Sequence, residues 1–288
     1  IPDLTFAATI NAVLHANATP VIVDIEDQSW CIDPKEIEKS ITSKTKAIIA
    51  VHLYGQVCDM DKIMSLAKQY NLKIIEDCAE AHGAMFKGNK VGSFGDIGCF
   101  SFFGNKVITT GEGGMCVTNS AELSDKLKLL RDHGMSKTKR YYHEVVGFNY
   151  RMTNLQAAIG LAQLERIDEI HKNRFSYEKL YRKIMSHSHF EFQQDLINRK
   201  RITWLVCLLV AENDKNERDV LIDLFKDNGI EARPFFYLLS DMDIYKKYSR
   251  SVSTSAKKIS NCGINLPAYE SLKSLAEIEK IIKKIIKQ

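Results

Sequence analysis

Short apolar runs alternate with amphipathic stretches along the first part of the chain. In order, the runs predicted to form strand, helix, strand, helix and strand are 20–25, 34–43, 46–52, 59–70 and 72–77. Ile37 and Ile41 lie four residues apart, as on one face of a helix, whereas the last run has the length of a buried strand. This alternation predicts the βαβ units of a mostly parallel sheet flanked by helices.

Smaller elements are predicted between residues 83 and 131. The glycine-rich segment 83–98 indicates a turn or short hairpin. The apolar run 99–105 predicts a strand that delivers Lys106, and 114–118 predicts one more strand. Leucines spaced four and three residues apart over 122–131 predict a helix that covers the sheet.

The second half of the chain has a different order of elements. A helical pattern runs almost unbroken over 155–185 and suits a bridge between domains. The segments predicted to follow, as strand, strand, helix, strand and a terminal docking helix, are 190–194, 202–210, 218–227, the region near Ile230 and 275–286. We therefore expect an α/β protein with a large domain at 1–170 and a small α+β domain at 171–288.

Composition narrows the classes of function. The chain has 288 residues, 45% of them hydrophobic, and a net charge of +4 from 40 basic and 36 acidic side chains. This balance argues against a nucleic-acid surface. The longest apolar stretch, 204–211, is too short to span a bilayer, and no charged-then-apolar leader opens the chain. Seven cysteines without a C-x-x-C pair read as reduced thiols, so a cytoplasmic protein is expected.

Lys106 and Asp77 are the candidate chemical pair. A lysine held at a strand end among small residues can form an imine with a carbonyl cofactor, because desolvation keeps part of its amine uncharged. Asp77 stands at the carboxyl end of a predicted buried strand, where open α/β sheets place their ligands. Pyridoxal phosphate (PLP) needs such a carboxylate against its ring nitrogen. The alternatives are a solvated surface lysine and a capping acid.

Other polar residues remain open or are set aside. His52 and Gln56 either line the pocket or satisfy backbone groups in a turn. His82 either lies near the cofactor or makes a structural hydrogen bond. His187 and His189 form the only close histidine pair but lack suitably spaced partners, so no metal is expected. The glycines at 111–114 match neither a dinucleotide fingerprint nor a P-loop and indicate close backbone packing.

Four segments occur in the order and spacing of a known family. They are VHLYGQVCDMD (51–61), IEDCAEAHGA (75–84), FSFFGNKVITTGEGGM (100–115) and GFNYRMTNLQAAIGLAQLER (147–166). The chain resembles the DegT-type nucleotide-sugar aminotransferases, and within them the GDP-perosamine synthases and related 4-aminotransferases. The resemblance implies the fold of type I PLP enzymes. It also implies transfer of an amino group from glutamate to the C4 ketone of a nucleotide-linked 4-keto-6-deoxyhexose.

The resemblance also implies roles for individual residues. Lys106 would be the Schiff-base lysine and the proton shuttle, and Asp77 would hold the ring nitrogen. Glu80 stands where the family more often has glutamine near the ring hydroxyl, which requires a protonated or differently oriented carboxyl. Ser101 would donate to the phosphate, and Phe6 would stack on the ring. Asn149 would reach the phosphate of a neighbouring subunit, so a homodimer with shared sites is implied.

Two departures from the family keep other functions in view. Roughly eighty residues of the family pattern, including a phosphate-binding helix N-terminus, have no counterpart ahead of Ile1. Leu238, Leu239 and Ser240 replace an expected proline and histidine. The alternatives are a non-transaminating relative, such as a sugar dehydratase or regulator, and an inactive fragment that acts as a dimerisation module. Dehydratase relatives carry histidine in place of the lysine.

Overall fold

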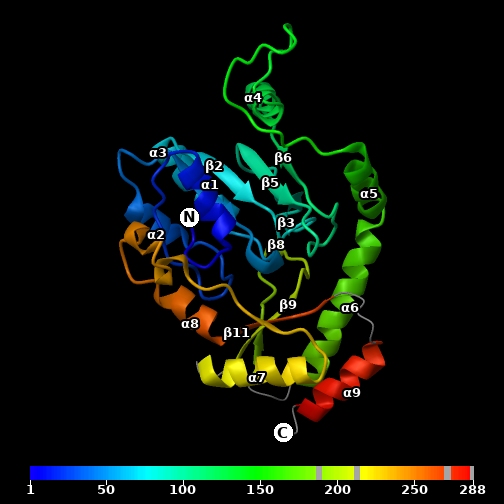
Figure 1. Ribbon diagram of the computed structural model, residues 1–288. Coiled ribbons are helices and arrows are strands. Elements are labelled where there is room, and N and C mark those ends of the chain that lie inside the picture. Colours follow the sequence, from blue (N-terminus) through cyan, green and yellow to red (C-terminus); the bar gives the residue numbers. More distant parts are fainter. Residues whose placement is uncertain (186–189, 211–214, 269–273, 286–288) are drawn as a thin grey trace.

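The computed structural model describes residues 1–185, 190–210, 215–268 and 274–285 (Figure 1). The helices are α1 (Ala7–His15), α2 (Pro34–Ser40), α3 (Met60–Tyr70), α4 (Ala121–Arg131), α5 (Asn154–Leu164), α6 (Ile167–Met185), α7 (Lys215–Asp227), α8 (Thr254–Cys262) and α9 (Leu275–Ile285). The strands are β1 (Ala47–Val51), β2 (Lys73–Asp77), β3 (Met85–Phe86), β4 (Asn89–Lys90), β5 (Ile97–Ser101), β6 (Gly114–Val117), β7 (Phe190–Phe192), β8 (Arg199–Lys200), β9 (Val206–Val210), β10 (Arg233–Pro234) and β11 (Gly263–Leu266). The pair His187 and His189 lies outside the described residues.

The first sheet confirms the predicted βαβ rhythm. Its strand order is β1-β2-β5-β6, with the first three strands parallel and β6 antiparallel to β5. The connecting helix α3 starts where Asp59 accepts a hydrogen bond from the Lys62 N–H, and it ends at Asn71 in the left-handed conformation. Parallel strands joined this way bring their carboxyl ends, including Asp77, to one edge of the sheet.

The second sheet forms the predicted α+β lobe. Its order is β10-β11-β9-β7, antiparallel throughout, and every residue of β9 is buried. A separate apolar cluster joins this sheet to α6, α7 and α9. Figure 1 shows α5 and α6 along one side of the molecule, with α9 packed beside α6. Position 170 falls inside α6, and the division into domains at that residue stays a prediction.

Besides the strand expected to carry Lys106, three predicted elements differ in the structure. Residues 20–25 form only isolated β-bridges, because their partners are single residues of separate loops. The helix expected over 155–185 is interrupted at Glu165 and Arg166, between α5 and α6. The leucine stripe of α4 covers no sheet: α4 has no buried residue and projects from the molecule in Figure 1.

Candidate functional site

Lys106 lies in a turn rather than on the strand that was expected to deliver it. Strand β5 ends at Ser101, and the chain then turns so that the Lys106 N–H donates to the Phe103 carbonyl at 3.0 Å. At the base of the turn, the Phe102 N–H donates a backbone hydrogen bond to the Gly113 carbonyl at 2.8 Å. The strand therefore fixes the base of the turn, and other contacts must fix its tip.

Residues from the second half of the chain hold that tip. The Trp204 Nε1–H donates to the Asn105 carbonyl at 2.8 Å, and Arg174 Nη2 donates to the Lys106 carbonyl at 3.4 Å. Arg174 also donates to the Trp204 carbonyl at 2.7 Å, so both contacts share one buried framework. Sequence reasoning missed Trp204 and Arg174, because nothing in the local pattern connects them to residues about 70 to 100 positions away.

The Lys106 amine is largely removed from water. Its side chain is 12% exposed, its Nζ lies 4.2 Å from the centroid of the Trp204 ring, and its nearest carboxylate oxygen is Glu80 Oε1 at 3.7 Å. A cation over an indole face gains electrostatic stabilisation, but without the short hydrogen bonds of a close ion pair. The amine is thus positioned without being neutralised by a tight partner.

Glu80 is the titratable neighbour of this amine. The Tyr54 N–H donates to Glu80 Oε2 at 2.8 Å. Burial raises the pKa of Glu80 to about 7, with Asp77 reinforcing the rise and Lys106 and the Tyr54 N–H opposing it. A carboxyl with this pKa is partly protonated near neutrality and can then donate a hydrogen bond. The resemblance to the family implied a protonated or differently oriented carboxyl at Glu80, and a pKa near 7 makes the protonated form accessible.

Asp77 stands at the end of β2 with both oxygens engaged. Thr9 Oγ1 donates to Oδ2 at 2.9 Å, and the Ala79 N–H donates to Oδ1 at 3.2 Å. Thr9 is buried on α1 and also shares a hydrogen bond with Thr5 at 3.1 Å. Helix α1 therefore fixes the orientation of the carboxylate. Thr9 gave no sequence signal, since it lies 68 positions from Asp77.

Ser101 shares the sheet face of Asp77. Asp77 pairs in register with Cys99, and Ser101 lies two residues further along β5. Because side chains alternate along a strand, these three project to the same side of the sheet. Ser101 Oγ accepts a hydrogen bond from the Phe103 N–H at 3.3 Å and is only partly buried. Among the described residues, no hydrogen bond is donated by the Ser101 hydroxyl, so its hydrogen remains available.

Phe6 is an exposed aromatic near the same region. It caps the start of α1, is 59% exposed, and its ring lies 5.6 Å from that of Phe236. Phe236 in turn contacts the Tyr54 ring at 5.2 Å and donates its N–H to the Tyr54 hydroxyl at 2.9 Å. An aromatic series therefore connects Phe6 to the residue that holds Glu80.

Asn149 is not brought to the other candidates. It is exposed and forms an antiparallel bridge with Asp132 in the projecting region after α4. The Tyr150 N–H donates to the Arg131 carbonyl at 3.1 Å, which fixes the segment to the end of that helix. Its role toward a neighbouring subunit stays a prediction.

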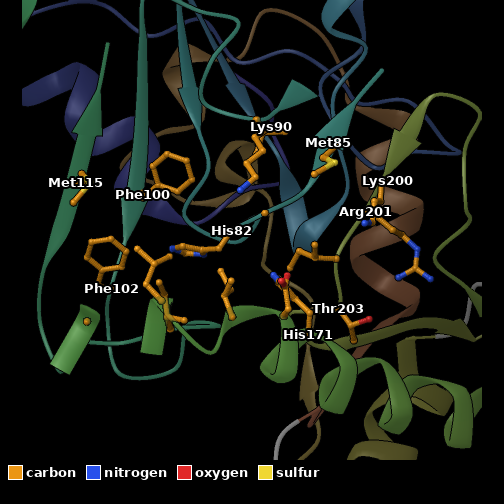
Figure 2. A pocket seen from close by; sticks show the side chains of 18 of the residues that line it. His82, Met85, Lys90, Phe100, Phe102, Met115, His171, Lys200, Arg201 and Thr203 are labelled. Carbon is orange, nitrogen blue, oxygen red and sulfur yellow. The ribbon is translucent and has the colours of Figure 1, made fainter. Parts of the chain in front are cut away.

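A cavity of about 1100 Å³ lies on the other face of the sheet (Figure 2). Its lining includes Phe100, Phe102, Met115, Val117, Leu161 and Leu164. It contains none of the six candidate site residues, because alternation along β5 and β6 sends the apolar side chains away from Asp77. The candidate site residues and this cavity are therefore separate.

His82 and His171 stand on the wall of this cavity. Neither ring has a hydrogen-bond partner at normal geometry, and the His82 ring packs against Phe100 and Phe102. Burial lowers the pKa of His82 to about 4, which keeps the ring neutral at physiological pH. The His82 ring therefore lies against the cavity and two aromatic rings, and its contact with the cofactor stays a prediction.

His52 and Gln56 satisfy backbone groups. His52 Nδ1 accepts from the Cys58 N–H at 3.2 Å, and Gln56 Nε2 donates to the Gln194 carbonyl at 2.9 Å. The other ring nitrogen of His52 lies 3.1 Å from Glu76 Oε2. The turn-forming alternative is thus the correct one for both residues.

Glu76 organises a buried cluster near His52. Its carboxylate also accepts N–H groups of Gly92, Phe94 and Gly95, each at 2.7 Å. The ligand atoms of His52, Glu76 and Cys78 lie within 4.8 Å of one another. Because the Glu76 oxygens already accept these hydrogen bonds, the cluster is accounted for as a structural support of the 92–95 turn.

The loop after β10 departs from the family pattern in a specific way. Leu238 and Leu239 are buried, and Ser240 binds Asp3 through its N–H at 2.8 Å and its hydroxyl at 2.6 Å. Tyr237 remains 54% exposed. The replacing residues therefore fix this loop to the beginning of the chain.

Comparison with known proteins identifies relatives of this arrangement. The model of the DegT/DnrJ/EryC1/StrS aminotransferase family matches residues 1–286. A GDP-perosamine synthase of Escherichia coli O157:H7 is 44% identical over 273 residues, which are 94% of this chain and 74% of that protein. A UDP-N-acetyl-3-dehydro-alpha-D-glucosamine 3-aminotransferase of Acidithiobacillus ferrooxidans is 51% identical over 168 residues, 58% of this chain and 45% of that protein.

Solved structures give the same result. A putative sugar aminotransferase from Streptococcus pneumoniae, solved in its PLP form, superposes with a TM-score of 0.90 at 26% identity, over 99% of this chain and 79% of that one. The expected α/β fold of type I PLP enzymes is therefore confirmed. Among the residues that the structure describes, no helix is both long and apolar enough to cross a bilayer.

Proposed function

The chain belongs to the DegT/DnrJ/EryC1/StrS aminotransferase family, and we propose that it transfers an amino group from L-glutamate to the C4 ketone of a nucleotide-linked 4-keto-6-deoxyhexose. It is a PLP-dependent sugar aminotransferase by family. The observation that carries the proposal is the Lys106 amine, desolvated over Trp204 and 3.7 Å from the titratable Glu80. Such an amine is suited to condense with a carbonyl and to carry protons.

The side chains of the site fit the groups of the cofactor. Lys106 supplies the amine for the aldehyde, and Asp77, already oriented by Thr9, supplies the carboxylate for the ring nitrogen. Glu80, with its pKa raised to about 7, can offer a carboxyl hydrogen to the ring hydroxyl. Ser101 offers a hydroxyl to the phosphate. When bound, PLP supplies an electron-withdrawing ring that stabilises negative charge at the substrate carbon.

Proton transfer falls to Lys106. Its amine would take the proton from the α-carbon of the donor substrate and return one to the carbon that was the aldehyde carbon of the cofactor, since a single flexible side chain can reach both positions. The Trp204 ring shields the amine on one side and excludes water there. Glu80 adjusts the charge beside the amine without forming a tight ion pair, so the amine stays free to exchange protons.

We propose a C4 rather than a C3 ketone because the 4-aminotransferase relative matches more of the chain. The GDP-perosamine synthase matches 94% of the chain, whereas the 3-aminotransferase matches 58%. The 4-aminotransferase assignment therefore rests on a match to both halves of the chain. A C3 ketone on a UDP-linked sugar is the second candidate, because the identity to that relative reaches 51% over the matched part.

A cytoplasmic homodimer with shared sites is part of the proposal. Asn149 is exposed and pairs with Asp132, the residue after α4, so it is available to a neighbouring subunit. The seven cysteines are free in the structure, and a reducing compartment would keep them so. A sugar dehydratase is disfavoured because the lysine is present at position 106.

Borohydride trapping and a substrate panel test the proposal. Reduction of the protein loaded with PLP should fix the cofactor on Lys106, and Lys106→Ala should give no adduct. The matched control is Lys90→Ala, which changes an exposed lysine of β4. With glutamate, the 4-keto-6-deoxy sugar nucleotides should be aminated and the 3-keto sugar should not. A cofactor fixed elsewhere, or glutamate turnover by Lys106→Ala, would contradict the assignment, and amination of the C3 ketone alone would select the second candidate.

A further inference from the structure

Cys99 and Cys116 face each other across the β5–β6 pair. They are register partners, and their Sγ atoms are 4.0 Å apart. The Phe102 N–H donates to the Gly113 carbonyl across the same ladder, and the Cys99 carbonyl instead accepts the N–H of Cys78, the residue after β2. Bonded and non-bonded pairs alternate in antiparallel strands, so the two cysteines occupy a non-hydrogen-bonded pair.

This type of pair suits a disulfide. Opposed Cα atoms in such a pair lie about 4.5 Å apart, at the short end of the range that disulfides span. The sulfur atoms need to approach from 4.0 Å to about 2.0 Å, which side-chain rotation supplies. The strand backbones therefore need not move far to accommodate the bond.

Access and reactivity differ between the two thiols. Cys116 is exposed, whereas Cys99 is only partly so. The hydrogen bond from Cys99 lowers the pKa of Cys116 to about 7, although burial opposes it. The same contact, burial and the nearby Asp77 and Cys78 raise the pKa of Cys99. Cys116 is thus the thiol that meets a reagent as thiolate, and Cys99 is the thiol that follows.

We propose that Cys99 and Cys116 form a reversible disulfide when the protein meets a low-molecular-weight disulfide such as oxidised glutathione. The Cys116 thiolate attacks one sulfur of the reagent, forming a mixed disulfide and releasing one small thiolate. Cys99 then loses its proton to solvent and attacks Cys116 Sγ, releasing the second small thiolate. Two electrons pass from the protein thiols to the reagent, which leaves as two small thiols. The argument for this disulfide does not depend on the proposed aminotransferase activity, although Cys99 projects to the same face of the sheet as Asp77 and Ser101.

The chain contains an internal control pair. Cys31 and Cys58 also influence each other, since Cys31 helps to raise the pKa of Cys58, but both are buried. Burial raises the pKa of Cys58 well above its usual range. Proximity alone is therefore common to both pairs, and only the pair on β5 and β6 combines proximity with access.

Thiol mapping after oxidation tests the proposal. The native full chain is incubated with oxidised glutathione over a pH series around neutrality, alkylated, digested and analysed by mass spectrometry. We expect a linked peptide pair containing Cys99 and Cys116, no Cys31–Cys58 link, and reversal by a reducing dithiol. The rate should rise with an apparent pKa of about 7.

Single variants resolve the order of steps. In Cys99→Ser, Cys116 should stop at the mixed disulfide. Cys116→Ser should give neither a linked peptide nor glutathione on Cys99. A wild-type protein that accumulates the mixed disulfide without linkage would overturn the proposal. So would no reaction at Cys116, or a Cys31–Cys58 link formed at the same rate, because the reaction would then reflect opening of the chain.

Discussion

Glu80→Gln tests the electrostatics of the lysine site through stability. Burial raises the pKa of Glu80 from 4.5 to about 7, so between these values the folded protein binds a proton that the unfolded chain has released. The stability contributed by this group is full below pH 4.5 and is lost as pH rises through 7. At 1.36 kcal/mol per pKa unit, the loss approaches about 3 kcal/mol above neutrality.

Glutamine has no charged form, so the stability of Glu80→Gln should not fall in this way as the pH rises through 7. We expect Glu80→Gln to unfold at a higher urea concentration than the wild type at pH values above about 7, and the difference should shrink as the pH is lowered toward 5. The matched control is Glu112→Gln, which changes an exposed glutamate and should follow the wild-type pH dependence. Urea unfolding of the three proteins over this pH range is the measurement. Parallel curves for wild type and Glu80→Gln would refute the raised pKa.

Three further predictions follow from individual contacts. Trp204→Ala should lower stability by about 3–5 kcal/mol in urea unfolding because it empties a buried indole site, and Trp204→Phe should lose less; equal losses would contradict this. Thr9→Val should lower the free energy of unfolding by about 1–2 kcal/mol and slow turnover, because Asp77 loses the hydrogen bond from Thr9. Thr9→Ser keeps the hydroxyl and is the control. Unchanged kinetics for Thr9→Val would argue against orientation of Asp77 by α1. The disulfide between Cys99 and Cys116 closes a short loop and should raise stability by about 3 kcal/mol, seen as a melting temperature higher by about 5 °C that falls again on reduction.

Elements with local causes could be predicted from the sequence. The β1-α3-β2 unit followed from two short apolar runs and an amphipathic stretch between Asp59 and Asn71, because capping and periodicity act over a few residues. The sheet-edge position of Asp77 followed from the same reasoning, since parallel strands share an edge. Lys106 was singled out by its setting between an apolar run and glycines.

Non-local contacts explain what sequence reasoning did not reach. The strand expected to carry Lys106 ends at Ser101, because the chain turns to meet Trp204, a partner distant in sequence. Thr9 and Arg174 have ordinary local surroundings, and their roles exist only through contacts with distant residues. The leucines of α4 have helical spacing, but none of them is buried against the part of the chain that the structure describes.

The contacts of Arg174 and Trp204 with the turn that carries Lys106 limit where the chain can be cut into two separately expressed pieces. A piece ending at residue 170 would retain Lys106 but lose Arg174 and Trp204, which hold the backbone of the turn and shade its amine. If two such pieces were expressed separately, their association would have to restore the surroundings of the Lys106 amine as well as join the two pieces. The position of the Lys106 amine therefore depends on residues from both halves of the chain.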